Sequence, residues 1–251
     1  MGMNTPWKTI VFDGSFDGFL SSVYAIYYEK INPLGIQTRN EITLADNLYF
    51  VETNSSHAIR VFSAIKEKIS HDAAQTVYYA FLSWEEERFA PILKYIRLGF
   101  TVGRMVNSYL QVDYVRRVQK MAMQTGKEAH KLHGFCRFIE TKQGVLYAQI
   151  TPKSDCLVLV AEHFKERLMN EAWLIHDKTR SQAAVYDGHE FVVVGSLKEN
   201  DIKLAPGEDV TQELWVTFFN NIAIKERTNK KLQRQLLPLY FRKNMTEFIR
   251  G

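Results

Sequence analysis

The sequence predicts an α+β fold in which an antiparallel sheet, formed mainly by residues 135–195, packs with amino-terminal and carboxy-terminal helices. Two observations carry this prediction. Apolar residues recur at the helical period through most of the chain before residue 133 and again after residue 208, whereas between these limits they alternate as in strands. Strands that are segregated from helices in this way favour an α+β fold over a doubly wound parallel sheet.

Each element is predicted from its local pattern. Helices are predicted over residues 16–30, 55–70, 73–82, 85–98, 104–131, 156–170 (as a helix, or as a strand passing into one) and 208–250, with Pro238 dividing the last. Strands are predicted over residues 9–12, 48–52, 135–140, 145–150, 173–177, 183–186 and 190–195. Residues 32–35, Asn-Pro-Leu-Gly, are interpreted as a turn, and Gly99 and Gly103 as the limits of a loop. No linker or repeat divides the chain, so we expect one domain over residues 1–251, with a strand-helix unit at residues 9–52 packed on the rest.

Residues 173–188, WLIHDKTRSQAAVYDG, gather chemically versatile side chains on a predicted hairpin. His176 and Asp177 end its first strand, and Lys178 and Arg180 lie in its turn. Successive side chains of a strand face opposite sides, so adjacency alone does not predict a His–Asp dyad. We treat His176 and Asp177 as catalytic candidates, and Lys178 and Arg180 as candidates for phosphate contacts.

The carboxy-terminal region is predicted to contain a basic helix. Its cations are Lys225, Arg227, Lys230, Lys231 and Arg234, followed after Pro238 by Arg242 and Lys243. Such a helix can neutralise phosphates, and the neighbouring Tyr240 and Phe241 can stack on bases. A solvated helix face explains the same pattern without a ligand.

Three further residues are site candidates. Asp13 opens an Asp-Gly-Ser segment between a strand and a helix, which can be an anion site or simply a turn before a capped helix, with Ser15 or Asp13 as the cap. His133 lies three residues after His130, but no local third ligand accompanies them, so a metal is not expected. Arg137 has the fork geometry that matches phosphate.

Composition excludes several classes of protein. The chain has 251 residues, a formal net charge of +4 and two cysteines, Cys136 and Cys156, which excludes a disulfide scaffold and a four-cysteine metal site. No phosphate-binding loop, dinucleotide fingerprint or other cofactor motif occurs, so no cofactor is expected. The absence of a signal sequence and of a long apolar segment predicts a cytoplasmic protein without membrane contact. The mild positive charge permits an anionic partner.

Several segments resemble a bacterial family of uncharacterised DNA-metabolism and DNA-repair proteins. The similar segments are residues 12–20 (FDGSFDGFL), 95–100 (YIRLGF), 133–140 (HGFCRFIE), 146–152 (LYAQITP), 163–168 (HFKERL), 173–188 and 214–247. The resemblance is strongest over about residues 80–250, which form the family-like core, and the first segment extends it to the amino terminus.

The resemblance implies a partner rather than a reaction. Members of that family accompany a radical-SAM protein similar to spore photoproduct lyase, and a related domain is fused to a uracil-DNA-glycosylase-like domain. The family supplies no catalytic residues, and the present chain lacks the cysteines of a radical-SAM cluster, so that chemistry would belong to the partner.

Three hypotheses about function follow. The first is a DNA-binding or adaptor subunit that works in DNA repair or DNA metabolism with the radical-SAM partner. The second is an enzyme of hydrolase or lyase type acting on nucleic acid, with His176 and Asp177 near its centre and arginines on the phosphates. The third is a protein–protein scaffold. Whether the chain is an enzyme is left open by the sequence.

Overall fold

The computed structural model describes residues 7–41, 47–195, 205–208, 211–214, 216 and 236–249. The chain divides into two compact units, residues 1–126 and residues 127–251, and each unit is described by itself. The single domain expected over residues 1–251 stays a prediction, because a division into compact units does not test whether the units fold together.

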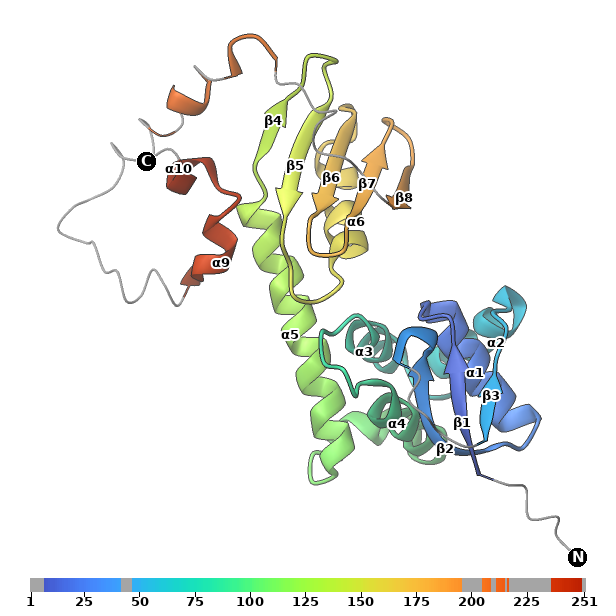
Figure 1. The fold of residues 1–251 in the computed structure, drawn as a ribbon. Helices are drawn as coiled ribbons and strands as arrows, with labels where there is room; N and C mark the ends of the chain where they lie inside the picture. Colours follow the sequence, from blue (N-terminus) through green and yellow to red (C-terminus); the bar gives the residue numbers. More distant parts are fainter. Residues whose placement is uncertain are drawn as a thin grey trace, which may run out of the picture. The chain divides into compact units, whose positions relative to one another are not determined.

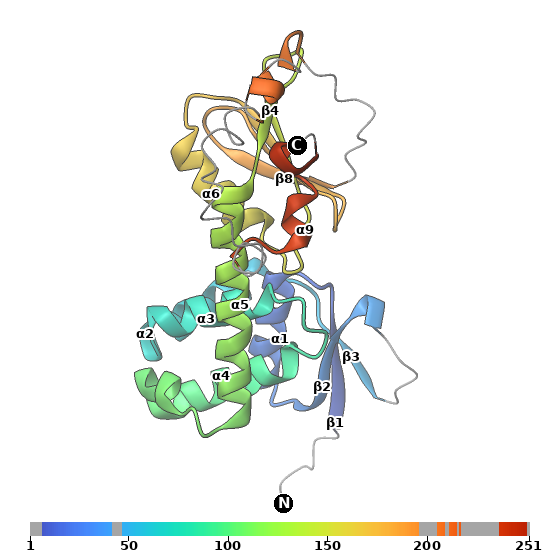
Figure 2. The same cartoon turned by 90° about the vertical axis from the view of Figure 1, so that its left-hand side faces the viewer.

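A three-stranded parallel sheet organises the first unit (Figure 1). Its strands, in spatial order, are β2 (Asn32–Thr38), β1 (Trp7–Phe12) and β3 (Leu48–Phe50). The helices of this unit are α1 (Phe16–Tyr28), α2 (Ser55–Lys68), α3 (His71–Phe81), α4 (Phe89–Val102) and the first part of α5 (Asp113–Phe135), with 3-10 turns η1 (Arg39–Glu41) and η2 (Gly103–Ser108). Figure 2 shows α1 and α4 on the same side of the sheet. The buried ring of Phe12 meets Phe19 of α1 and Phe89 of α4 at centroid distances of 6.1 and 5.0 Å, which joins the sheet to both helices.

The second unit is built on a five-stranded sheet of order β4-β5-β6-β7-β8. The strands are β4 (Phe138–Glu140), β5 (Leu146–Ile150), β6 (Trp173–Asp177), β7 (Gln182–Tyr186) and β8 (Phe191–Gly195). Neighbours pair antiparallel except β5 and β6, which are parallel because α6 (Leu157–Arg167) connects them as a crossover. Helices α9 (Leu239–Arg242) and α10 (Thr246–Ile249) lie near the carboxy terminus.

The core of the second unit lies on one face of this sheet. Trp173 is fully buried and stacks on Tyr186 with ring centroids 5.0 Å apart. The same cluster includes Phe164 of α6, Leu132 near the end of α5 (Asp113–Phe135), and Phe241 of α9. The sheet therefore buries one face against three helical segments, as expected for an α+β fold.

The predicted α+β class is confirmed, and so is the hairpin of residues 173–186, whose strands pair antiparallel from Trp173–Tyr186 to Asp177–Gln182. The sheet of residues 135–195 is mixed rather than purely antiparallel, since β5 and β6 run parallel. The sequence also did not predict a parallel sheet in the first unit, because β3 has only three residues and β2 begins with a turn-like segment.

The interpretation of residues 32–35 as a turn was wrong, because these residues begin strand β2. Pro33 cannot donate a backbone hydrogen bond, but β2 is an edge strand, and its register against β1 shifts between Lys8 and Thr9. Edge strands and bulges are the positions in which a sheet accepts proline.

The expected loop between Gly99 and Gly103 was also wrong. Helix α4 continues through Gly99 and ends at Val102, and its C-cap Gly103 has φ 61° and ψ −143°, a conformation that glycine adopts more readily than residues with a side chain. A Cβ on Gly99 would lie 2.5 Å from Cδ1 of Ile69, so this glycine permits α4 to pack closely against the end of α2. The long helix expected from residue 104 begins instead at Asp113, after η2.

The start of α1 is fixed by a hydrogen-bond network centred on Asp13. Its Oδ1 accepts hydrogen bonds from the backbone N–H (2.9 Å) and hydroxyl (2.7 Å) of Ser15, and its Oδ2 accepts one from the Thr53 hydroxyl (2.7 Å). Ser15 is the N-cap, and its Oγ accepts from the N–H of Gly18 (2.9 Å). A Cβ on Gly18 would lie 2.1 Å from Oδ1 of Asp13, so only glycine leaves room for this carboxylate.

We therefore expect Gly18→Ala to destabilise the protein although alanine is the better helix former. Displacing the Asp13 carboxylate should outweigh the gain in helix propensity and lower the free energy of unfolding by roughly 1–2 kcal/mol, measured by denaturant titration. Gly134→Ala is the control, because Gly134 is also helical and its Cβ would meet nothing within 4 Å. That variant should be neutral or gain up to about 1 kcal/mol. Equal effects at the two positions would contradict the proposed role of Gly18.

Candidate functional site

Five of the predicted phosphate-contacting residues lie outside the described part of the chain. They are Lys225, Arg227, Lys230, Lys231 and Arg234. Of the two that follow Pro238, Arg242 lies 4.6 Å over the ring of Phe248, and Lys243 is exposed just beyond α9.

In the hairpin of β6 and β7, Asp177 and Arg180 hold the turn together. Asp177 is fully buried, and its Oδ1 accepts hydrogen bonds from the backbone N–H groups of Thr179 (2.8 Å) and Arg180 (3.3 Å). The guanidinium of Arg180 pairs with Oδ2 of Asp177 at 3.1 Å and donates to the carbonyls of Pro152 and Lys153. These contacts give both residues a structural role at the turn.

Lys178 lies in the same turn and is exposed to solvent. Its backbone N–H donates a hydrogen bond to the carbonyl of Ile150 (3.0 Å). Of the cations that the sequence placed on this hairpin, it is the one whose side chain reaches solvent most readily.

His176 belongs to a different set of contacts from its neighbour Asp177. Its Nδ1 lies 3.1 Å from the hydroxyl of Tyr147, which also accepts a hydrogen bond from Nε2 of Gln149 (2.9 Å). Both His176 and Tyr147 are buried. The two candidate residues thus have separate partners, in keeping with the alternation of side chains along a strand.

A small polar cavity lies beside this chain of hydrogen bonds. It has a volume of about 150 Å³, and its lining includes Arg137, Tyr147, Gln149, Asn244 and Thr246. Arg137 and Tyr147 therefore line the same cavity, and His176 is connected to it by its hydrogen bond with Tyr147.

The charge of Arg137 is already compensated there. Its guanidinium forms a two-point ion pair with Glu247 (2.7 and 3.3 Å) and donates to the carbonyls of Gly134 and Cys136. The positive charge that Arg137 brings to the cavity is therefore balanced by Glu247.

Asp13 occupies the amino-terminal end of α1 itself, so this helix end carries its own carboxylate. The hydrogen bonds from Thr53 and Ser15, with the nearby charge of Arg39, outweigh the opposing effect of burial and hold the pKa of Asp13 below its usual value of 3.8. The structure supports the capped-turn interpretation of this segment.

His133 stacks on His163 of α6 with ring centroids 4.0 Å apart and an interplanar angle of 7°. Burial, followed by the neighbouring His163, lowers the pKa of His133 below its usual value of 6.5. Among the described residues, no group of three or more His, Cys, Asp or Glu side chains is placed to hold a metal ion.

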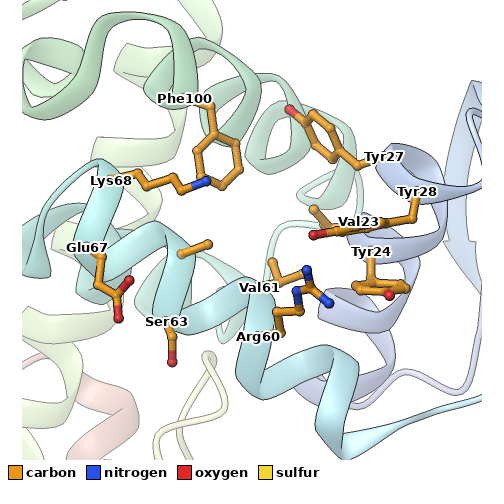
Figure 3. A pocket seen from close by; sticks show the side chains of 11 residues that line it. Val23, Tyr24, Tyr27, Tyr28, Arg60, Val61, Ser63, Glu67, Lys68 and Phe100 are labelled. Atoms are coloured by element: carbon orange, nitrogen blue, oxygen red, sulfur yellow. The ribbon is translucent and has the colours of Figure 1, made fainter.

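A cavity in the first unit with several aromatic residues in its lining was not predicted. This cavity of about 640 Å³ opens between α1, α2 and α4 (Figure 3). Its aromatic residues are Tyr24, Tyr27, Tyr28 and Phe100, and its charged residues are Arg60, Lys68 and Glu67. Figure 3 shows Lys68 beside Phe100 on one side of the cavity, the three tyrosines and Arg60 on the other, and Glu67 turned away from the space between them.

The rings of this cavity are held in a fixed arrangement. Tyr24 stacks between His57 (3.8 Å, 9°) and Tyr28 (4.2 Å, 17°), and the guanidinium of Arg60 lies 4.8 Å from the centroid of the Tyr28 ring. Tyr27 meets Phe100 edge to face at 5.8 Å. Cation–π contact and stacking of this kind hold aromatic side chains in place without covering them completely.

A third cation approaches the cavity through Tyr27. Burial raises the pKa of the Tyr27 phenol, and this effect exceeds the opposing influence of the charge and hydrogen bond of Arg97. Tyr27 therefore stays neutral, and its hydroxyl forms a hydrogen bond with Arg97.

The sequence held a signal for this site. Tyr24, Tyr27 and Tyr28 lie three and four residues apart, so they share one face of a helix. Helical spacing alone does not distinguish a tyrosine that is buried in the core from one that lines a cavity. The spacing therefore does not show which of the two positions Tyr27 occupies. Arg60 and Lys68 lie eight residues apart on α2, again on one face, but their position opposite α1 depends on tertiary packing.

The geometry defines an α+β protein with an aromatic, cation-rimmed cavity in its first unit and a small polar cavity in its second. A family profile described as "Domain of unknown function (DUF4130)" matches residues 86–247, and the chain belongs to this family. The match begins before α4 and includes Phe100, whereas α1 and α2, which supply the other walls of the aromatic cavity, precede it. No curated protein sequence matches the chain. Among the helices of the described residues, none has the length and apolar character needed to cross a bilayer.

The lowered pKa of His133 predicts a specific pH dependence. The unfolded state takes up a proton at His133 near the usual pKa of 6.5, while the folded state resists it, so folding stability should fall as the pH drops through this value. His133→Gln should reduce the loss of stability between about pH 7.5 and about pH 5.5, as measured by denaturant titration. His71→Gln, at an exposed position at the start of α3, is the control, because His71 is not among the groups that shift the pKa of His133. An unchanged pH profile in the His133 variant would show that the stacked pair does not resist protonation.

Proposed function

We propose that this chain is a nucleic-acid-binding or adaptor subunit in DNA repair or DNA metabolism, working with a radical-SAM partner. The observation that carries the proposal is the cavity of the first unit, in which partly exposed tyrosines lie next to Arg60 and Lys68. Aromatic faces that accept bases, beside cations that neutralise phosphates, are the combination used by proteins that bind nucleic acid without reading its sequence.

The charge of the chain supports this proposal. A formal net charge of +4 favours association with a polyanion. The participation of a radical-SAM partner rests on the family resemblance alone, and co-purification of the two proteins is its direct test.

The cationic rim can be tested by salt dependence. Arg60→Gln and Lys68→Gln together should weaken binding to a fluorescently labelled oligonucleotide and reduce the slope of log affinity against log salt by about 0.7 for each phosphate that is no longer neutralised. Fluorescence anisotropy at several salt concentrations measures both quantities.

Lys66→Gln is the matched control for these substitutions. Lys66 lies on the same helix and makes a similar contact, with its Nζ 4.3 Å over the ring of Phe62, but it does not line the cavity. We expect its affinity and salt slope to equal those of the unmodified protein. An oligonucleotide that binds equally well to all three proteins would place nucleic-acid binding elsewhere on the chain, and the absence of any salt-dependent binding would refute the proposal.

A second candidate function is an enzyme of hydrolase or lyase type acting on nucleic acid. The observation that favours it is the hydrogen bond between His176 and Tyr147 at a cavity that Arg137 also lines. His176 is buried and does not line this cavity, so a proton would pass between it and a bound group through the hydroxyl of Tyr147.

This alternative predicts that the unmodified protein cleaves or converts an end-labelled oligonucleotide in the presence of the partner. His176→Gln should abolish the conversion, and Tyr147→Phe, which removes only the hydroxyl, should reduce it by about tenfold or more. Circular dichroism of both variants checks that they remain folded. Conversion at the normal rate by folded variants would exclude this pair from the chemistry.

A further inference from the structure

We infer that the cavity of the first unit captures an unpaired base, so that the protein prefers single-stranded over double-stranded nucleic acid. The inference rests on the proposed nucleic-acid-binding function and names the form of nucleic acid that the cavity takes. It follows from the exposure of two rings, the size of the cavity and the position of its cations.

The rings that would receive a base are accessible from solvent. Tyr28 is 55% exposed and Tyr27 is 42% exposed, although both lie on the wall of a cavity. A base can stack on such a ring only when its own face is uncovered. In a duplex both faces of an internal base are covered by its neighbours, whereas in a single strand they become available.

The volume of the cavity points the same way. About 640 Å³ lies within the range of roughly 300–1,000 Å³ that is typical of small-molecule sites. This space holds a base with part of its sugar and phosphate. A double helix is far too wide to enter between α1, α2 and α4.

The cations lie where the phosphates of an inserted base would pass. Arg60 is 4.8 Å from the ring of Tyr28 and 6.0 Å from that of Tyr24, while Lys68 stands on the opposite side, beside Phe100 (Figure 3). A base placed between these sides has one cation within reach on each side of its backbone. Both cations belong to α2, so their spacing is set by one rigid element.

The receiving surface is also formed in advance. The stack of His57, Tyr24 and Tyr28 fixes the plane of Tyr28, and contact with Phe100 restricts Tyr27. Rings that are already ordered lose little conformational entropy when a base stacks on them, which strengthens binding.

The test uses three fluorescently labelled oligonucleotides of equal length: an ordinary single strand, a single strand in which every nucleotide is abasic, and a duplex. The abasic strand keeps the phosphates and lacks the bases, so it isolates stacking from charge. Anisotropy titrations of the full chain should show that the ordinary strand binds roughly 5- to 100-fold more tightly than the abasic strand. The duplex should bind more weakly than the ordinary single strand.

Substitution of one ring locates the effect. Tyr28→Leu should lower the affinity for the ordinary strand to near that for the abasic strand, and should leave abasic binding unchanged. Phe50→Leu is the control, because Phe50 is equally exposed (55%) and lies on β3, away from the cavity. If the Tyr28 variant does not fold, the comparison of the ordinary and abasic strands by the unmodified protein decides the matter.

The outcomes separate the inference from the function on which it rests. Equal affinity for the ordinary and abasic strands, or a preference for the duplex, overturns base capture while nucleic-acid binding stands. Lack of binding to all three oligonucleotides overturns both. Loss of base-dependent affinity in the Phe50 variant but not in the Tyr28 variant would move the stacking surface to the sheet and overturn the assignment of the cavity.

Discussion

The aromatic cavity depends on the hydrogen bonds that tie the segment before α2 to the first half of α1. Thr53 donates to Asp13 at the start of α1, and the backbone of Asn54, which caps α2, exchanges hydrogen bonds with the hydroxyl of Ser21 (3.0 and 3.2 Å). These contacts fix where each helix begins and how closely the two helices approach. From Ser15 onward the helical period places Tyr24, Tyr27 and Tyr28 on one side of α1, where Tyr24 and Tyr28 contact α2 and Tyr27 contacts α4.

The local elements of this fold could be predicted from the sequence, but its tertiary features could not. The hairpin of β6 and β7 follows from alternation around a polar turn, and Ser15 was recognised as a possible cap because serine satisfies helix amides. Strand β2 was missed because Asn32 and Pro33 are typical of turns, and only pairing with the buried strand β1 makes them extended. The parallel pairing of β5 and β6 was missed although residues 156–170 were interpreted as a helix or as a strand passing into one, because the second alternative conceals the strand-helix-strand pattern of a crossover.

The candidate site shows the same division between local and tertiary information. Reasoning from charge selected Arg137 and Arg180, yet each of these guanidinium groups pairs with a carboxylate of Glu247 or Asp177 and supports the fold. Arg60 was not predicted as a site residue, because no pattern in the neighbouring sequence indicates that it lies over the ring of Tyr28. The presence of a cationic residue in the sequence is therefore a weaker guide to a binding site than the side chains that surround it in the folded protein.

The most direct measurement for the central claim is an NMR titration of the full chain with a short single strand, observing the aromatic side chains. Stacking of a base should shift the ring resonances of Tyr27, Tyr28 and Phe100 upfield, with smaller changes at the side chains of Arg60 and Lys68. Changes confined to the second unit, with the resonances of these three rings unmoved at saturation, would contradict the assignment of the cavity as the nucleic-acid site.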